Sequence, residues 1–267
     1  MKTRTPTEFL YSVFTLLAAV IVVHGFYVAM VRPSAQAVLV AQAAAMKTDP
    51  DFVPERSLWV IMKDYEQETC LILMLWALAL IGYKGRAASR ERALLEQDLV
   101  QVPEGMRILP EDTREYVRQL EALPVERKGM LTVRALRAAL ARFGATRNVQ
   151  DVSEASRAVM QAEADRLDAE LSMIRYIAWA IPAIGFIGTV RGIGDALAEA
   201  HKAVTGDIAG VTAGLGVAFN STFVALTLSL LLMFLLHYLQ LAQERLVLDA
   251  ETYLDDKLLR NLQVRSW

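Results

Sequence analysis

The sequence contains one cysteine, Cys70, and only three histidines, His24, His201 and His237. One cysteine cannot form an intrachain disulfide, and scattered histidines do not provide the ligand cluster of a zinc site or a redox couple. The chain also lacks a GxxxxGK phosphate loop, a GxSxG nucleophile elbow, an HExxH zinc pair and a GxGxxG dinucleotide fingerprint. We therefore expect no enzyme active site, no metal and no cofactor.

The chain has no excess of positive charge either, because 28 Lys and Arg stand against 30 Asp and Glu and leave a net charge of −2. A nucleic-acid-binding protein would need a basic face, so this class is excluded. What the chain has in excess is apolar residues, at 54% of the sequence with a mean hydropathy of +0.31, against about 45–50% in ordinary soluble domains. They lie in a few long blocks, which is typical of a membrane protein.

Four apolar runs predict transmembrane helices, since about 20 apolar residues cross a hydrocarbon core of ~30 Å. The runs are Phe9–Val31, Thr69–Tyr83, Ile174–Ala196 and Ala209–Leu239. The second run is short, but it can borrow Tyr65 and the residues after it at the outer boundary. We expect an all-α integral membrane protein with four transmembrane helices.

The first run has an alternative interpretation as a secretory signal peptide. Lys2 and Arg4 form a basic start, and residues 35–37 resemble an A-x-A cleavage site. The hydrophobic region of a signal peptide is only about 7–15 residues long, and Arg32 just beyond the run also disfavours cleavage. If the run were cleaved, three spans with an outside N-terminus would remain.

Basic flanks predict the orientation, because Lys and Arg collect on the cytoplasmic side of a membrane. A basic cluster follows the second run directly: Lys84, Arg86, Arg90 and Arg92. Together with Lys2 and Arg4, it places residues 84–172 and the C-terminus inside, and residues 32–65 and 197–208 outside.

The last two spans are predicted to continue into water as long helices. Asp151 and Glu154 form a capping-box pattern, and no Gly or Pro follows before Pro182, so we expect a helix of about 30 residues and about 45 Å. No Gly or Pro occurs after Gly216 through Gln263, so the fourth span also extends beyond the membrane. Its outer part carries one apolar stripe typical of a packing helix: Val247, Ala250, Leu254 and Leu258.

These features predict four segments. Residues 1–83 form a transmembrane hairpin with an outer loop at about 32–65, and residues 84–172 form a cytoplasmic helical domain with breaks at its prolines. Residues 173–240 form a two-helix membrane domain, and residues 241–267 form a C-terminal cytoplasmic helix. We expect the two long helices to join a cytoplasmic helical bundle.

Small and hydroxyl residues recur at intervals of three and four on the last two spans, so each set shares one helix face. The third run carries Ala178, Pro182, Gly185, Thr189, Gly192 and Ala196, with Gly188 and Gly194 beside them. The fourth carries Gly214, Ala218, Thr222, Ala225 and Ser229, beside Asn220, Ser221 and Thr227. Such stripes allow close helix packing in a membrane. The hydroxyls either line a polar path or bond their own i−4 carbonyls.

None of the four runs has Asp, Glu or Lys near its middle, and the nearest charges are Arg175 and Arg191 towards the ends of the third. Proteins that move protons or cations usually carry an intramembrane carboxylate. Either the chain conducts nothing, or a partner supplies the acid.

Two segments, AIPAIGFIGTVRGIGDAL at 180–197 and GVTAGLGVAFNSTFVALTLSLLLMFLLHYL at 210–239, resemble the MotA/TolQ/ExbB proton channel family. The FIGTV core and the small-residue run through NST carry the resemblance, which covers about a third of the chain. The family's two pore-facing threonines carry over to Thr189 and Thr222. The resemblance makes residues 173–240 the channel domain.

The resemblance implies a homopentamer in the bacterial inner membrane around a single-span protein of the TolR/ExbD/MotB kind, whose membrane Asp carries the proton. This chain would then be the channel or stator subunit of an ion-driven motor, with protons, or sodium ions, crossing beside Thr189 and Thr222. On this interpretation Asn220, Ser221 and Ser229 also line the path. Packing and pore shape would fall to the remaining small residues of the stripes and the proline: Pro182, Gly185, Gly188, Gly192, Gly214 and Ala218.

The sequence departs from the family pattern at two positions. Val217 stands where the TolQ and ExbB branch commonly has a Glu, and Arg191 stands where it often has an aromatic residue. Four predicted spans resemble the flagellar stator branch more closely, whereas FIGTV favours the other. The alternative function is a non-conducting oligomeric scaffold that recruits cytoplasmic proteins.

Overall fold

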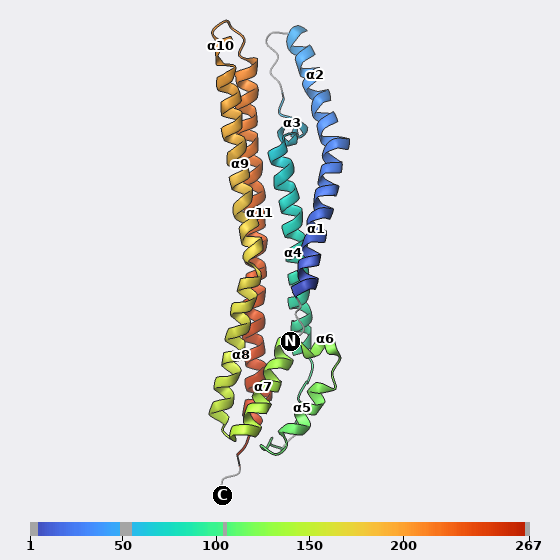
Figure 1. Cartoon of the computed structure of the whole chain (residues 1–267), viewed down its shortest axis with the longest axis vertical. Helices are drawn as coiled ribbons and strands as arrows, with labels where there is room; N and C mark the ends of the chain where they lie inside the picture. The colour runs from blue at the N-terminus through green and yellow to red at the C-terminus, as the bar shows by residue number, and fades with distance from the viewer. Residues whose placement is uncertain (1–4, 49–54, 104–105, 265–267) are drawn as a thin grey trace. The chain divides into compact units, whose positions relative to one another are not determined.

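The computed structural model describes residues 5–48, 55–103 and 106–264, and these residues form helices without a β-strand (Figure 1). The N-terminal half contains α1 Thr5–Phe26, the π-helix η1 Tyr27–Val31, α2 Arg32–Thr48, α3 Leu58–Met62 and α4 Tyr65–Leu95. Three shorter helices follow, α5 Thr113–Glu121, α6 Val125–Lys128 and α7 Leu131–Thr146. The rest comprises α8 Val149–Glu170, α9 Ser172–Ala198, α10 Ala200–Ala203, α11 Ala209–Lys257 and the 3₁₀ turn η2 Leu259–Asn261.

Four helical stretches are long and apolar enough to cross a membrane. They are Glu8–Thr48, Tyr65–Leu95, Val149–Ala198 and Ala209–Asn261. Each contains one of the four apolar runs, so the prediction of an all-α membrane protein with four spanning helices is confirmed. Lys2 and Arg4, on which the predicted orientation partly depends, lie outside the described residues.

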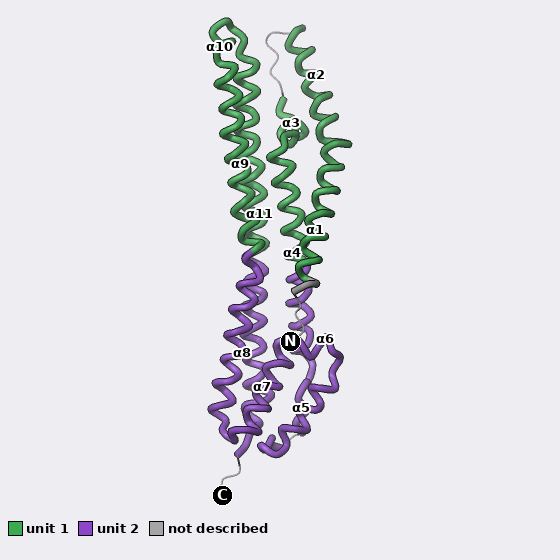
Figure 2. The backbone as a smooth tube through the Cα atoms, in the orientation of Figure 1, with its two compact units in different colours: residues 1–82, 173–236 green, residues 83–172, 237–267 purple. Residues whose placement is uncertain are grey.

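The chain forms two compact units (Figure 2). Unit 1 comprises residues 1–82 and 173–236, and unit 2 comprises residues 83–172 and 237–267. The boundaries between the two units lie close to the borders of the four expected segments. Unit 1 combines the first and third of these segments, and unit 2 combines the second and fourth. Each unit is thus assembled from two parts that are distant in the sequence.

In unit 1, α1 and α4 run antiparallel. Trp76 Nε1 donates to Ser12 O at 3.0 Å, and Tyr11 Oη donates to Ala79 O at 3.3 Å. A small apolar cluster of Val23, Tyr27 and Val31, with Met62, Leu71 and Ile72 around it, lies further along the same contact. The helices α9 and α11 also run side by side (Figure 1), and their contact forms the candidate site.

The first helix does not end at Val31, where its apolar run ends. Pro33 has no N–H and cannot continue the i→i−4 ladder, and the turn before it widens into the π-helix, in which the Arg32 N–H donates to Tyr27 O. The helix then continues through the alanine-rich α2 to Thr48. Residues 32–48 of the expected outer loop are therefore helical, residues 49–54 lie outside the described residues, and the position of this segment outside the membrane stays a prediction.

Unit 2 is built around α7. Its apolar face is fully buried, and its residues Leu131, Val133, Ala135, Leu136, Ala139, Leu140 and Phe143 pack into one core. The outer part of α11 contributes the stripe predicted from its sequence, with Val247, Ala250, Leu254 and Leu258 all buried in that core. The stripe is therefore confirmed as a packing face.

The predicted start of the helix at Asp151 is wrong by a few residues. The N-cap of α8 is Asn148, whose Oδ1 accepts the Gln150 N–H at 3.0 Å. Asp151 instead accepts from Asn148 Nδ2 at 3.1 Å. The expected unbroken helix is also interrupted, because the chain turns at Leu171 between α8 and α9.

Candidate functional site

Glycines bring α9 and α11 into close contact. A Cβ on Gly192 would lie 2.5 Å from Ala218 N and 2.6 Å from Gly214 O, and one on Gly214 would lie 2.6 Å from Ala196 N. At Gly188 a Cβ would meet the Ser221 side chain at 2.5 Å. Gly185 is equally close to Ala225 and Ser221 O. In a membrane such backbone proximity provides the packing that holds two helices together.

Thr189 and Thr222 meet across this contact. Their hydroxyl oxygens share a short hydrogen bond. Thr189 Oγ1 also lies 3.2 Å from Gly185 O and from Ala218 O, and Thr222 Oγ1 lies 3.5 Å from Gly185 O. Both side chains are only half-buried in the single chain. The two threonines that the stripes place on the small-residue faces therefore form one polar pair with an open side.

Ser229 has a different environment from the threonine pair. Pro182, inside α9, lacks the N–H that would bond Ala178 O four residues earlier, and Ser229 Oγ donates to that carbonyl at 3.1 Å. Ser229 is buried. Its hydroxyl thus satisfies a backbone acceptor that the proline leaves free, as expected for proline in a membrane helix.

The other two polar residues of the predicted path also differ from the threonines. Ser221 is buried against Gly188, and its hydroxyl bonds the Val217 carbonyl of its own helix at 2.8 Å. Asn220 is half-buried on α11. The role of all five residues in an ion path stays a prediction, and only Thr189 and Thr222 are brought together.

Sequence reasoning missed the acidic residues at the start of α4. Glu66 and Glu68 lie in the stretch after Tyr65 that the short second run borrows at its outer boundary, and the sequence analysis gives them no partner and no role. In the structure, Glu66 pairs with Arg191 of α9 at 2.7 Å, and Glu68 lies 2.6 Å from His24 of α1. Because His24 and Arg191 belong to the first and third runs, two carboxylates reach helices within their apolar runs. These contacts depend on how the helices pair in the fold, and the residue pattern of a single apolar run does not predict them.

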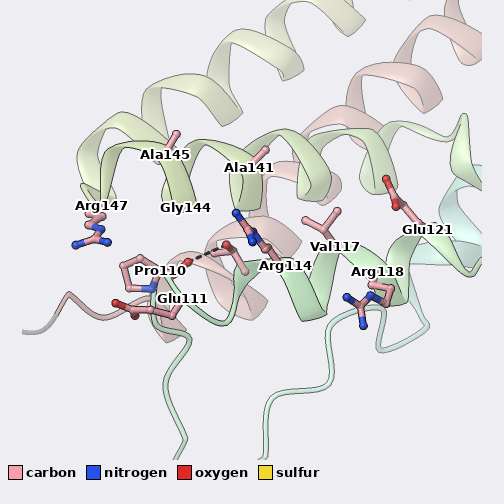
Figure 3. A pocket seen from close by; sticks show the side chains of 11 residues that line it. Pro110, Glu111, Arg114, Val117, Arg118, Glu121, Ala141, Gly144, Ala145 and Arg147 are labelled. Carbon is pink, nitrogen blue, oxygen red and sulfur yellow. Dashed lines mark hydrogen bonds between the residues drawn. The ribbon is translucent and has the colours of Figure 1, made fainter.

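A second feature lies in unit 2, where α5 and α7 line an open groove of about 730 Å³ (Figure 3). Arg114, Arg118 and Arg147 border it. Within the described part of the chain, no hydrogen bond or ion pair of these three side chains is found, whereas Glu121 on the same rim pairs with Arg137 at 3.2 Å. The groove is therefore an open surface whose charged lining consists of three arginines and two glutamates, Glu111 and Glu121.

Comparison with known proteins identifies one relationship. Residues 129–252 match the model of the MotA/TolQ/ExbB proton channel family. The matched segment extends from the start of α7 into α11 and contains Thr189, Thr222 and Arg191. The family resemblance in the sequence is thereby confirmed for this segment, and the family implies an ion-channel or stator-type role. No curated protein and no solved structure matches the chain.

Proposed function

We propose that this chain is the channel and stator subunit of a proton-driven motor complex. The observation that carries the proposal is the hydroxyl pair of Thr189 and Thr222, which lies on the glycine-lined contact of α9 and α11 inside the family-matched segment. The chain assembles as a homopentamer in the bacterial inner membrane. It encloses the membrane helices of a TolR/ExbD/MotB-like partner, with residues 84–172 and the C-terminus on the cytoplasmic side.

The threonine pair is suited to receive a partner carboxyl group. Two hydroxyls carry two protons and four acceptor lone pairs; one proton serves the mutual bond, and the other is within reach of a backbone carbonyl, Gly185 O or Ala218 O. Lone pairs on the open side remain for water or for a protonated Asp of the partner. A polar pair in an apolar wall thereby favours one position of the acid over its neighbours.

Ion flow would do work through that acid. When it is charged, its contact with the apolar wall is costly, and protonation removes this cost. Each elementary charge that crosses contributes about 2.3 kcal/mol per 100 mV, so one or two protons suffice for a step of several kcal/mol. Sodium remains the alternative ion, because hydroxyl and carbonyl oxygens coordinate it as well.

The test is ion flux in liposomes that contain the purified complex with its single-span partner. The double variant Thr189→Val, Thr222→Val keeps side-chain shape but removes both hydroxyls, and we expect the flux to be lost while the oligomer still assembles. Thr227→Val is the matched control, since Thr227 is exposed on the same helix and bonds only Phe223 O at 2.8 Å. Normal flux in the assembled double variant would refute the proposed pathway.

The groove of unit 2 favours a second candidate, the non-conducting scaffold that recruits cytoplasmic proteins. Three arginines without a bound partner in the described residues could hold an acidic segment of a recruited protein (Figure 3). In that case Arg114→Ala with Arg147→Ala would abolish activity in the cell, and the double threonine variant would not. The opposite result would support the channel function.

A further inference from the structure

Glu68 of α4 lies between two basic side chains of the N-terminal helix. Its Oε1 is 2.6 Å from His24 Nδ1, and its Oε2 is 2.5 Å from Arg32 Nη2. Glu68 is only 5% exposed. The Arg32 guanidinium is also held over the ring of Tyr65, 4.6 Å from its centroid. A carboxylate at this depth is costly unless both oxygens are paired, and here both are.

The π-helix η1 lies between the two basic residues that hold Glu68. In a regular α-helix two residues eight positions apart differ by about 80° around the axis. The wider π turn, with its i→i+5 hydrogen bonds, unwinds the helix and reduces this angle, so His24 and Arg32 can face the same carboxylate. Because Pro33 causes the wide turn, the sequence contains a backbone feature that assembles the cluster, and π turns often occur at functional sites.

Three unpartnered oxygen atoms lie around this cluster. Tyr27 Oη, Asp64 Oδ2 and Gln67 Oε1 are buried without a hydrogen-bond partner among the described residues. Tyr27 belongs to η1, Asp64 directly precedes α4, and Gln67 lies in the first turn of α4 beside Glu68. Buried polar atoms of this kind are normally satisfied by ordered water. These atoms favour access of ordered water to the ionisable cluster.

We propose that His24 and Glu68 form a proton-exchange site of this chain, separate from Thr189 and Thr222. The carboxylate accepts the Nδ1–H of His24, which fixes the tautomer and leaves the lone pair on Nε2. Nε2 makes no hydrogen bond within the described residues, and 58% of the His24 side chain is exposed in the single chain. When hydronium donates, an N–H bond forms at Nε2, an O–H bond breaks and water leaves, and release reverses these steps.

The surrounding charges permit the imidazole to gain and lose this proton. Arg32 already neutralises Glu68, so His24 changes the charge of the cluster from zero to +1. The second nearby carboxylate, Asp64, faces Lys63 at 3.3 Å and Arg191 at 3.8 Å. The other groups on the adjoining elements include the Glu66–Arg191 pair, Asp195 at 3.7 Å from Arg191, the Tyr27 and Tyr65 phenols and the buried Cys70 thiol. Protonation of His24 thus changes the charge of the cluster by one unit among side chains that are otherwise held in ion pairs.

The first test is nitrogen-15 NMR of histidine in the purified full chain in lipid nanodiscs, without the partner. Because the chain has three histidines, the substitutions His24→Gln and His237→Gln assign the signals. We expect the neutral His24 to carry its proton on Nδ1, to become doubly protonated when the buffer is acidified, and to lose the Nδ1 preference in Glu68→Ala. A proton on Nε2 in the wild type, or a ring that stays neutral in acid, would overturn the proposal.

The second test is proton flux through the complete complex. We expect His24→Gln to lower the flux several-fold and to change its pH profile, and His237→Gln to leave both unchanged, since His237 is exposed on α11 and has no carboxylate contact in the structure. An unchanged profile in His24→Gln would also overturn the proposal. A wild-type complex without any flux would refute the channel function instead, and the NMR result on the chain alone would still decide the present inference.

Discussion

Arg191 of α9 binds both carboxylate oxygens of Glu66 at the start of α4, with Nε 2.7 Å from Oε1 and Nη2 2.8 Å from Oε2. Gly188, one turn earlier on α9, permits this approach, because a Cβ there would lie 3.0 Å from Glu66 Cγ. The pair explains the arginine at the position where the related branch often has an aromatic residue. Its acidic partner lies outside the family-matched segment, so the two positions are joined only in the fold.

The first prediction concerns this ion pair. Glu66 has a side chain that is only 11% exposed, so Arg191→Gln leaves a nearly buried carboxylate without its bidentate partner. Because the Arg191 side chain is 41% exposed, we expect a loss of about 1–2 kcal/mol in the free energy of unfolding, below the range measured for fully buried pairs. Thermal unfolding of the purified protein in detergent measures it.

Arg260→Gln is the matched control for this pair. Arg260 bonds Asp256 at 2.8 Å four residues earlier on the same chain, and both side chains are exposed, so the expected loss is at most about 0.5 kcal/mol. Equal losses in the two variants would contradict the assignment of a structural role to Glu66 and Arg191.

The second prediction concerns the glycines between α9 and α11. Gly192→Ala places a methyl group 2.5 Å from a backbone nitrogen of the opposite helix, so the helices must separate, at an expected cost of about 1–3 kcal/mol. Gly194→Ala adds the same methyl group where nothing lies within 4 Å, and it should be neutral or stabilising by about 0.5–1 kcal/mol through helix propensity. Chemical denaturation measures the free energy of unfolding of both variants and separates the effect of helix packing from that of helix propensity. A similar loss of stability in both variants would argue against close contact at Gly192.

The third prediction is a coupling between Ser229 and Pro182. Ser229→Ala removes the side-chain donor that bonds Ala178 O in the described part of the chain, so we expect a loss of about 1–3 kcal/mol for the unsatisfied buried carbonyl. In a Pro182→Ala background the new N–H supplies the helical bond, and the same serine substitution should cost much less. A double-mutant cycle measures the difference, and strictly additive effects would disprove the compensation.

The fourth prediction is an alkaline pH effect at Tyr253, beyond the apolar run of α11. Its hydroxyl donates to Gln97 O at 3.0 Å and accepts the Leu99 N–H at 2.9 Å, and burial raises the pKa of this phenol. A raised folded-state pKa contributes stability that is present below the ordinary tyrosine pKa of about 10 and is lost as the pH rises through the folded value.

Tyr253→Phe tests this effect. At neutral pH we expect a loss of about 1 kcal/mol from the missing hydrogen bonds. Above about pH 10 the wild type should lose stability more steeply than the variant, so the difference between them narrows. Denaturant unfolding at neutral and alkaline pH provides the measurement, and a constant difference across the two conditions would contradict the assignment.

The four spanning helices could be predicted from the sequence because each apolar run is a local property that needs only length and composition. The same holds for the stripe at Val247 to Leu258 and for the faces that carry Thr189 and Thr222, since a helical period fixes which residues share a face. The ends of the helices were predicted less accurately than their existence. The N-cap at Asn148 and the continuation of the first helix past Arg32 depend on competing local hydrogen bonds, and a pattern of hydrophobicity does not rank these.

The sequence by itself determined an all-helical membrane protein, its four apolar spans and the two threonine faces, because these follow from the spacing of residues along single helices. Only the tertiary structure decided which faces meet. It joins the Thr189 and Thr222 hydroxyls, directs Ser229 to the carbonyl freed by Pro182, and brings Glu66 and Glu68 to Arg191 and His24. Such pairs depend on the antiparallel alignment of helices far apart in the chain, and this alignment is set by packing across the whole unit rather than by any local pattern.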